Sequence, residues 1–328
     1  MKQLLKTISI IFVITGLLFL VSCNNDYDKF INEFISEYIN ESTSEDATSS
    51  NANEESTTEC GENINDYAIN NTQAYTVQES ELLLGTLVIV NKDHKFDLAE
   101  KDLDLIDTYD YRVAHQADAK SPPYKITAMV NSKLTAEAVE HLHDMLTELN
   151  RATRVISYIN TAYRTFEDQN EFTKPAAAGY SDFHTGLLVS LKGYVGGTAL
   201  DITAEGNETM YQWLLSNAHK YGFVQRYPEG KETVTGINDY LSCFRYVGVA
   251  HATYMKNNNL CLEEYVEFIK NEKPTVENPI KIESKDGGIY AVYYYDYEGG
   301  SAEIQVPEKN YTISGTNTGG IIVTVKLK

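Results

Sequence analysis

The side chains that could carry chemistry lie in the middle of the chain, and few of them form a specific set. Ser181 and His184 are close in sequence, but neither a G-x-S-x-G elbow nor an ordered triad accompanies them. Cys243 with a nearby histidine is equally unspecific for nucleophilic cysteine chemistry. Ordinary hydrogen-bonded histidines remain the alternative to a functional role.

Three segments give a stronger signal, because their order and spacing agree with the motifs of one enzyme family. They are residues 163–169 (YRTFEDQ), 179–187 (GYSDFHTGL) and 240–248 (YLSCFRYVG). They resemble the G-Y-R-S-x-x-x-Q, G-x-S-E-H-x-T-G-L-A-x-D and E-P-W-H-x-R-Y-V-G motifs of the VanY-type D-alanyl-D-alanine carboxypeptidases. The resemblance covers roughly residues 82–270 and implies an α+β domain with a small antiparallel sheet and packed helices.

The family resemblance implies a zinc site that this sequence does not reproduce. In the family, His, Asp and a second His hold zinc, which lowers the pKa of a bound water and polarises the peptide carbonyl, while a glutamate takes the proton of the water. Phenylalanine has no lone pair, serine is a poor ligand, and tyrosine, with a pKa of about 10, is a poor base at neutral pH. In this chain, the position of the first histidine is Phe183 and that of the aspartate is Ser190. The position of the second histidine is Cys243, and that of the glutamate is Tyr240.

This mismatch predicts a catalytically inactive homologue without a cofactor. The alternative is an active zinc carboxypeptidase with relocated ligands. His184 lies one residue from the expected ligand, but adjacent residues of a strand point to opposite faces unless a bulge intervenes. Asp201 follows a glycine-rich insertion at residues 192–198 (KGYVGGT), and His251 lies eight residues past Cys243.

The residues that line the peptide cleft in the family are retained here. The resemblance places Arg164 beside the scissile carbonyl, and a guanidinium can pair bidentately with a carboxylate such as a D-Ala terminus. We therefore expect a peptidoglycan stem peptide as a possible partner; the alternative is that Arg164 only braces the fold, as we expect for Arg245 and Tyr246. A structural or regulatory role with another envelope protein is a third hypothesis. The expected substrate-binding residues are Tyr163, Arg164, Gln169, Ser181 and Thr185.

The spacing of apolar residues predicts the elements that would position this site. Helices are expected at residues 135–149, at 210–221 before Gly222, and at 261–270 before Pro274. Strands are expected at 82–90, 187–191 and 244–250. The elements follow no repeating βαβ pattern, which favours an α+β class. From residue 273 to 328 the composition changes, and β-branched and aromatic runs predict a small β-module with strands at 289–297, 302–306, 311–314 and 321–327.

The first 22 residues have the pattern of an export signal. Lys2 and Lys6 precede an apolar run at residues 8–19, which is too short to span a membrane. The run ends in LVSC, which resembles a lipobox and implies a lipid on Cys23 that anchors the protein to the extracytoplasmic face of the cell membrane. An ordinary secretory peptide with a chance cysteine is the alternative.

Residues 23–76 are expected to be an acidic spacer, and residues 77–272 the carboxypeptidase-like domain. Residues 24–66 contain twelve acids and one lysine, in a chain with a net charge of −20. This charge argues against nucleic acid as a partner, because phosphates need Lys and Arg. Beyond Cys23, three cysteines remain (Cys60, Cys243 and Cys261) without a CxxC pair, so no disulfide framework is indicated and one bridge stays open.

Overall fold

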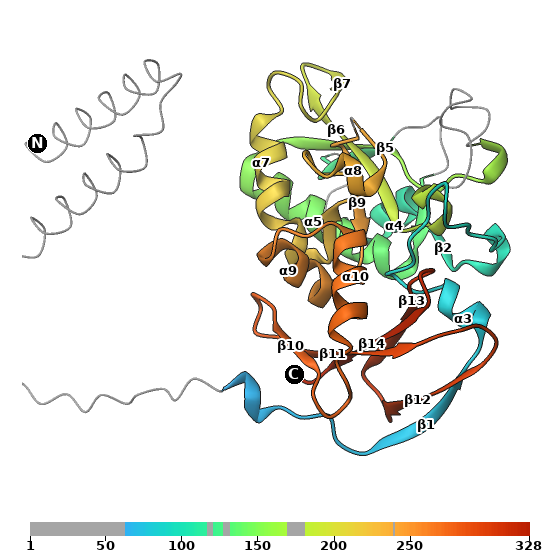
Figure 1. Cartoon of the computed structure of the whole chain (residues 1–328). Helices are drawn as coiled ribbons and strands as arrows, with labels where there is room; N and C mark the ends of the chain where they lie inside the picture. Colours follow the sequence, from blue (N-terminus) through green and yellow to red (C-terminus); the bar gives the residue numbers. More distant parts are fainter. Residues whose placement is uncertain (1–62, 117–120, 127–131, 169–180, 239) are drawn as a thin grey trace, which may run out of the picture. The chain divides into compact units, whose positions relative to one another are not determined.

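The computed structural model of the chain describes residues 63–116, 121–126, 132–168, 181–238 and 240–328, shown in colour in Figure 1. The predicted export signal, Cys23, most of the predicted spacer and Gln169 lie outside these residues. Within the described part, helices and small, mainly antiparallel sheets are mixed, which confirms the predicted α+β class. No helix of the described part is long and apolar enough to cross a membrane.

A six-stranded sheet forms the centre of the carboxypeptidase-like region. Its strands follow the order β3-β5-β6-β9-β8, and β7 pairs with β6. The β3–β5 pair is parallel and the other pairs are antiparallel. The strands are β3 Tyr124–Ile126, β5 Ile156–Thr161, β6 Leu188–Val195, β7 Thr198–Leu200, β8 Phe223–Gln225 and β9 Cys243–Tyr246. A separate pair consists of β2 (Leu105–Asp107) and β4 (Lys133–Thr135).

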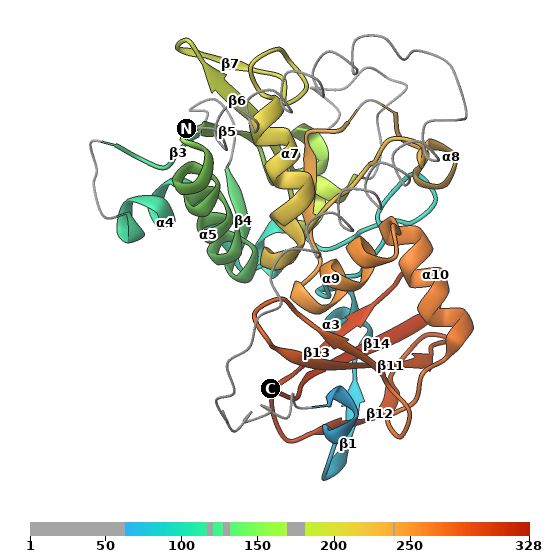
Figure 2. The same cartoon turned by 90° about the vertical axis from the view of Figure 1, so that its left-hand side faces the viewer.

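One face of the central sheet is covered by α5 (Ala136–Thr153) and α7 (Glu208–Asn217), which pack side by side (Figure 2). The helix α5 buries a stripe of residues at helical spacing, as its sequence predicted, and ends at Arg154 in the left-handed conformation. From β6, Val189 and Leu191 join this apolar core. Because side chains alternate along a strand, Ser190 and Tyr194 point to the opposite face, where the site residues lie.

The other predicted helices are also confirmed within one or two residues at most ends. The predicted helix at 210–221 is α7 followed by the 3₁₀ helix η5 (Ala218–Tyr221), and Gly222 ends it with φ +77°. The predicted helix at 261–270 is α10. The bounds of α10 are Leu262–Glu272. The remaining helices are α3 Glu79–Leu83, α4 Thr108–His115, α8 Glu232–Thr235 and α9 Val249–Asn257, with 3₁₀ helices η1 Ile64–Asp66, η2 Glu100–Asp102 and η4 Asp182–Thr185.

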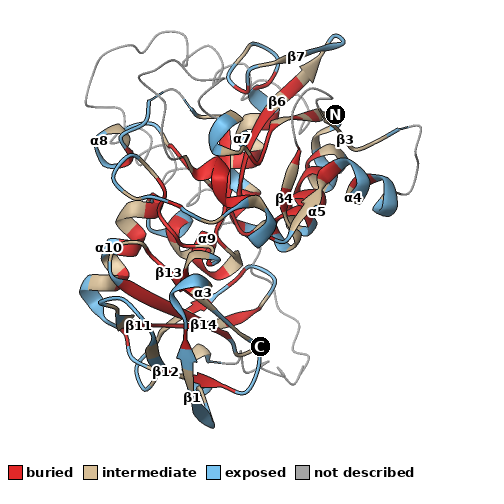
Figure 3. Ribbon diagram, turned by 90° about the vertical axis from the view of Figure 1, so that its right-hand side faces the viewer, coloured by how far each residue is buried: buried red, intermediate tan, exposed pale blue. Residues whose placement is uncertain are grey.

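The C-terminal sheet has the order β10-β11-β14-β13, and β12 pairs with β1. All pairs are antiparallel, and the ribbons of β11 and β14 are largely coloured as buried in Figure 3. Val292 and Ile322 share an apolar core with Val266 and Ile269 of α10. The strands are β1 Thr72–Val77, β10 Ile280–Glu283, β11 Ile289–Asp296, β12 Ala302–Pro307, β13 Tyr311–Gly315 and β14 Gly320–Lys326.

Three expectations about the elements need correction. Residues 72–76 were placed in the spacer, but they belong to β1, whose backbone pairs with β12. Residues 82–90 form the end of α3 and a buried irregular segment instead of a strand, because their backbone groups bond to side chains: Arg245 donates to the carbonyls of Thr86 and Val88. Residues 249–250 begin α9 instead of continuing β9.

Candidate functional site

The segment that carries the central motif is a 3₁₀ turn and not the strand that was assumed for His184. The Ser181 hydroxyl accepts from the backbone N–H of Phe183, and the Thr185 hydroxyl donates to the Asp182 carbonyl at 2.7 Å. Gly186 ends the turn at φ +67°, where an added Cβ would meet the Leu105 side chain. The hydroxyls of Ser181 and Thr185, predicted to bind substrate, therefore hold the turn in place.

The four positions that match the zinc ligands and the base lie around this turn. Phe183 and Cys243 are buried and pack together with Leu188 and Tyr227. Ser190 lies opposite Cys243 in the β6–β9 ladder, and its hydroxyl shares a hydrogen bond of 3.1 Å with that of Ser242. Tyr240 is 45% exposed and stands edge-on to the Tyr227 ring. An apolar cluster thus fills the place of the expected donor set.

The surroundings of Cys243 disfavour a thiolate. Burial raises the pKa of the Cys243 thiol to about 12, and this outweighs the opposing effects of the hydrogen bond with Ser242 and the charge of Arg164. A thiol binds zinc as the thiolate. Phe183, Ser190, Tyr240 and a protonated Cys243 therefore do not fit a zinc ion at these positions.

Arg164 lies beside this cluster, just after the end of β5. Its Nε donates to the Thr161 hydroxyl at 3.3 Å, and its guanidinium carbon lies 4.5 Å from the centroid of the Phe183 ring. The backbone of Arg164 is held by the turn, because its N–H donates to the Phe183 carbonyl and its carbonyl accepts from Nδ1 of His184. Burial lowers the pKa of Arg164, although the nearby acidic groups oppose this. A positive charge is thus fixed at the edge of the apolar cluster.

The ring of Tyr163 packs in the core and also lines a small cavity. Its ring is buried against Val88, Val90 and Phe96, and burial raises the pKa of Tyr163 to about 12. A cavity of about 240 Å³ lies beside it and is also lined by Phe166 and His184. Of the expected substrate-binding residues within the described part, Arg164 is the one with a charged group at this site.

The relocated zinc ligands are not brought together. Nδ1 of His184 donates to the Arg164 carbonyl at 2.8 Å, and the Asp201 carboxylate accepts from the Thr203 backbone and hydroxyl. His251 is buried between the hydroxyls of Tyr265 and Thr324. Among the residues that the structure describes, no group of three or more His, Cys, Asp or Glu side chains is arranged to hold a metal ion.

A buried network of charges behind the turn was missed by the sequence analysis. Asp182 accepts hydrogen bonds from Arg226 and Arg245, and all three side chains are at most 1% exposed. Arg226 also donates to both carboxylate oxygens of Glu263 on α10, at 2.8 and 2.6 Å. Arg245 braces the fold as expected, and Tyr246 does so by donating to Glu137 at 2.7 Å. The sequence signal that could have indicated this network is the arginine–tyrosine pair that occurs at residues 226–227 and again at 245–246.

Comparisons with known proteins identify the family to which this fold belongs. Residues 131–249 match the family model of VanY, D-alanyl-D-alanine carboxypeptidase. A D-alanyl-D-alanine carboxypeptidase of Enterococcus faecium is 32% identical over 273 residues, which cover 78% of this chain and 80% of the relative. The chain therefore belongs to the VanY-type D-alanyl-D-alanine carboxypeptidase family, as its motifs predicted.

One solved structure supports the fold. The vancomycin-resistance D,D-dipeptidase VanXYg, solved with a D-Ala-D-Ala phosphinate analogue, has a TM-score of 0.61 at 24% identity and covers 78% of this chain and 99% of its own. A VanY D,D-pentapeptidase from the VanB-type cassette, at 26% identity and a TM-score of 0.41, covers 55% of this chain and 98% of its own and was solved with Zn(II). Because a VanY protein was solved with Zn(II), the expectation of no cofactor is wrong, and we do not retain it.

Proposed function

We propose that this protein is a catalytically silent member of its family that binds peptidoglycan stem peptides ending in D-alanine. The observation that carries the proposal is the contrast within one site. Phe183 and Cys243 form an apolar cluster at two of the donor positions, while the guanidinium of Arg164 stays fixed against the Phe183 ring. The site therefore keeps a group that can hold a peptide carboxylate and changes the groups that would cleave the peptide.

Hydrolysis of an amide requires a water activated by a base and stabilisation of the developing charge. The matched position of the base is Tyr240, whose phenol lacks the carboxylate of a glutamate general base. The Cys243 thiol is protonated, because burial raises its pKa to about 12. A protonated thiol cannot take a proton from water, and no carboxylate stands at the position of the base, which supports loss of the hydrolytic step.

Binding of a carboxylate is supported by the setting of Arg164. A guanidinium and a carboxylate form a bidentate pair, and partial burial protects such a pair from screening by salt. The hydrogen bond to Thr161 and the contact with the Phe183 ring restrict the arginine, so less entropy is lost when a ligand binds.

The predicted lipid on Cys23 would place this binding domain at the outer face of the cell membrane, next to its ligand. We include this location in the proposal because the sequence resembles a lipobox after an apolar run. The sequence of residues 24–66, with its many acids, would then separate the folded domain from the lipid.

Titration calorimetry with a stem pentapeptide tests the binding. Arg164→Ala should weaken binding of a peptide with a free D-Ala carboxylate by about ten- to a hundredfold, because a charge-assisted hydrogen-bond pair contributes about 1.5–3 kcal/mol. The same peptide with a C-terminal amide should bind the unaltered chain as weakly. Arg151→Ala, at an exposed arginine paired with Glu148, is the matched control and should leave affinity unchanged. Equal affinity of the Arg164→Ala variant for the acid and the amide, at the level of the unaltered chain, would contradict the proposal.

A further inference from the structure

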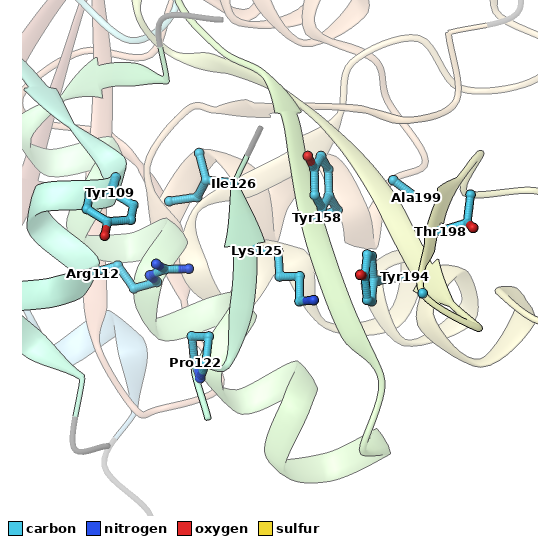
Figure 4. A pocket seen from close by; sticks show the side chains of 10 residues that line it. Tyr109, Arg112, Pro122, Lys125, Ile126, Tyr158, Tyr194, Thr198 and Ala199 are labelled. Carbon is cyan, nitrogen blue, oxygen red and sulfur yellow. The ribbon is translucent and has the colours of Figure 1, made fainter. Parts of the chain in front are cut away.

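A cavity of about 590 Å³ lies at the far end of β6, on the sheet face that also carries Ser190 (Figure 4). Tyr194 is four residues beyond Ser190 on β6, and Tyr158 on β5 pairs with Lys192, so Tyr158 and Tyr194 project from the same face as Ser190. At a rise of about 3.3 Å per residue, this end of the strand is about 13 Å from the position of Ser190. The cavity volume lies within the range of ordinary ligand sites.

The charges around this cavity are unusual for the chain. The net charge of the protein is −20, but the described residues that line the cavity include Arg112 and Lys125 and no Asp or Glu. The Lys125 ammonium lies 3.7 Å from the centroid of the Tyr194 ring and forms no ion pair with a described carboxylate. The Lys125 ammonium thus contacts an aromatic ring instead of a carboxylate among the described residues, and its charge can interact with an anion.

Arg112 adds a second, buried cation. Its side chain lies near the rings of Tyr109 and Tyr124, and Nη1 donates to the Tyr124 carbonyl at 2.7 Å. The residue is only 8% exposed, and its Nε has no hydrogen-bond partner among the described residues. Because Nε itself is buried, Arg112 acts on the cavity through the charge of its guanidinium, which lies in the cavity wall.

The aromatic lining suits a ring-shaped ligand. The rings of Tyr158 and Tyr194 are nearly parallel, with an interplanar angle of 9° and centroids 6.2 Å apart. Figure 4 shows both rings and Lys125 between β3 and β7, with Arg112 on the other side of β3. Parallel tyrosines offer flat apolar faces with hydroxyl groups at their edges, which match the C–H faces and the hydroxyl groups of a sugar.

We propose that this cavity binds the sugar-bearing, acidic end of the same stem peptide, with the sugar ring against Tyr158 and Tyr194 and a carboxylate near Lys125 and Arg112. This inference rests on the proposed function, because the C-terminal D-Ala of the ligand would lie at Arg164. The ligand is then a glycopeptide that extends along β6, and the cavity selects peptides that are still attached to the glycan.

The test compares two ligands on the full-length chain by calorimetry: a free stem pentapeptide and the same peptide attached to its disaccharide. The glycopeptide should bind at least tenfold more tightly. Tyr194→Ala and Lys125→Met should each reduce its affinity about three- to tenfold and leave the affinity for the free peptide unchanged. Lys309→Met, at an exposed lysine in the bend between β12 and β13, is the matched control. Unchanged thermal unfolding shows that a variant is folded, and Lys125→Met carries the test if Tyr194→Ala is not.

The outcomes separate this inference from the proposed function. Equal affinity for both ligands, or a sugar-dependent gain that survives both variants, overturns the cavity and leaves the Arg164 site intact. A tenfold gain that both variants reduce, in a chain where Arg164→Ala has no effect on the free peptide, supports the cavity and overturns the Arg164 site. No binding of either ligand overturns both.

Discussion

Among the four matched positions, Cys243 carries the side chain that could bind a metal, and its neighbours keep it protonated. It is fully buried against Phe183, Leu188 and Tyr227, where a thiolate would lose its hydration. The positive charge of Arg164 opposes this effect and does not overcome it. At the scale of single residues, the surroundings of Cys243 therefore favour the protonated thiol.

Alkylation of Cys243 by iodoacetamide measures this directly. In the folded protein we expect a low rate without a titration step between pH 6 and 10, because the pKa of the thiol is raised to about 12. In the urea-unfolded chain the rate should rise around pH 8.5. Mass spectrometry of the Cys243 peptide follows the reaction. A step near pH 8.5 in the folded protein would show that burial does not protect the thiol.

The buried carboxylate of Asp182 should contribute strongly to the stability of the fold. Asp182→Asn keeps the shape of the side chain but removes the charge that Arg226 and Arg245 share, so we expect a loss of about 3–5 kcal/mol in the free energy of unfolding. Asp93→Asn breaks an exposed pair with Lys92 and should cost less than about 1 kcal/mol. Urea unfolding compares the two. Equal small losses would mean that the buried network does not stabilise the turn.

At the scale of elements, Gly222 joins the end of η5 to β8. It has φ +77°, and an added Cβ would lie 2.6 Å from the Tyr246 ring and 3.1 Å from the backbone of residues 248 and 249. Gly222→Ala should therefore cost about 1–3 kcal/mol more than Gly236→Ala, where φ is also positive but no atom lies within 4 Å. Thermal unfolding of both variants checks this difference, and equal shifts would exclude the steric effect.

The sequence predicted those elements whose signal is local. The helices α5, α7 and α10 have apolar residues at helical spacing and clear ends, and the C-terminal strands have β-branched and aromatic runs. The failures depend on partners far away in sequence. β1 pairs with β12, more than 200 residues later, and the segment at 86–90 bonds to Arg245 and Ser314. Neither pairing can be read from nearby residues.

The sequence motifs located the segments around the candidate site, but they predicted only part of its geometry. Motif spacing located Phe183, Ser190 and Cys243, and the structure brings Ser190 and Cys243 to paired positions. Spacing did not indicate that Ser181 and Thr185 hold a 3₁₀ turn, or that Asp182 joins two arginines behind it. These roles arise from three-dimensional contacts between β6, β8, β9 and α10.

At the scale of the whole molecule, His251 connects α9 to α10 and to β14 of the C-terminal sheet. Nδ1 of His251 lies 2.7 Å from the Tyr265 hydroxyl, and Nε2 lies 2.8 Å from the Thr324 hydroxyl. Burial lowers the pKa of His251 to about 3, so the ring is neutral in the folded protein over most of the acid range. The unfolded chain binds a proton at this histidine below about pH 6.5.

The stability of the protein should therefore fall as the pH decreases from about 6.5 towards 3, by up to about 1.4 kcal/mol per pH unit for this histidine. His251→Gln, which keeps a neutral hydrogen-bonding group, should reduce that slope. Some slope should remain, because burial also lowers the pKa of His219, to about 4. Urea unfolding at pH 7, 6, 5 and 4 gives the slopes, and identical slopes would exclude His251 as a source.

On the proposed function, the protein binds stem peptides without cleaving them. The most direct measurement is the release of D-alanine from a stem pentapeptide by the full-length chain, with zinc supplied and an active VanY relative as the positive control. We predict no release above that of a sample without protein, at peptide concentrations that saturate binding. Release of D-alanine that a chelator abolishes would contradict the account and identify the protein as a working carboxypeptidase.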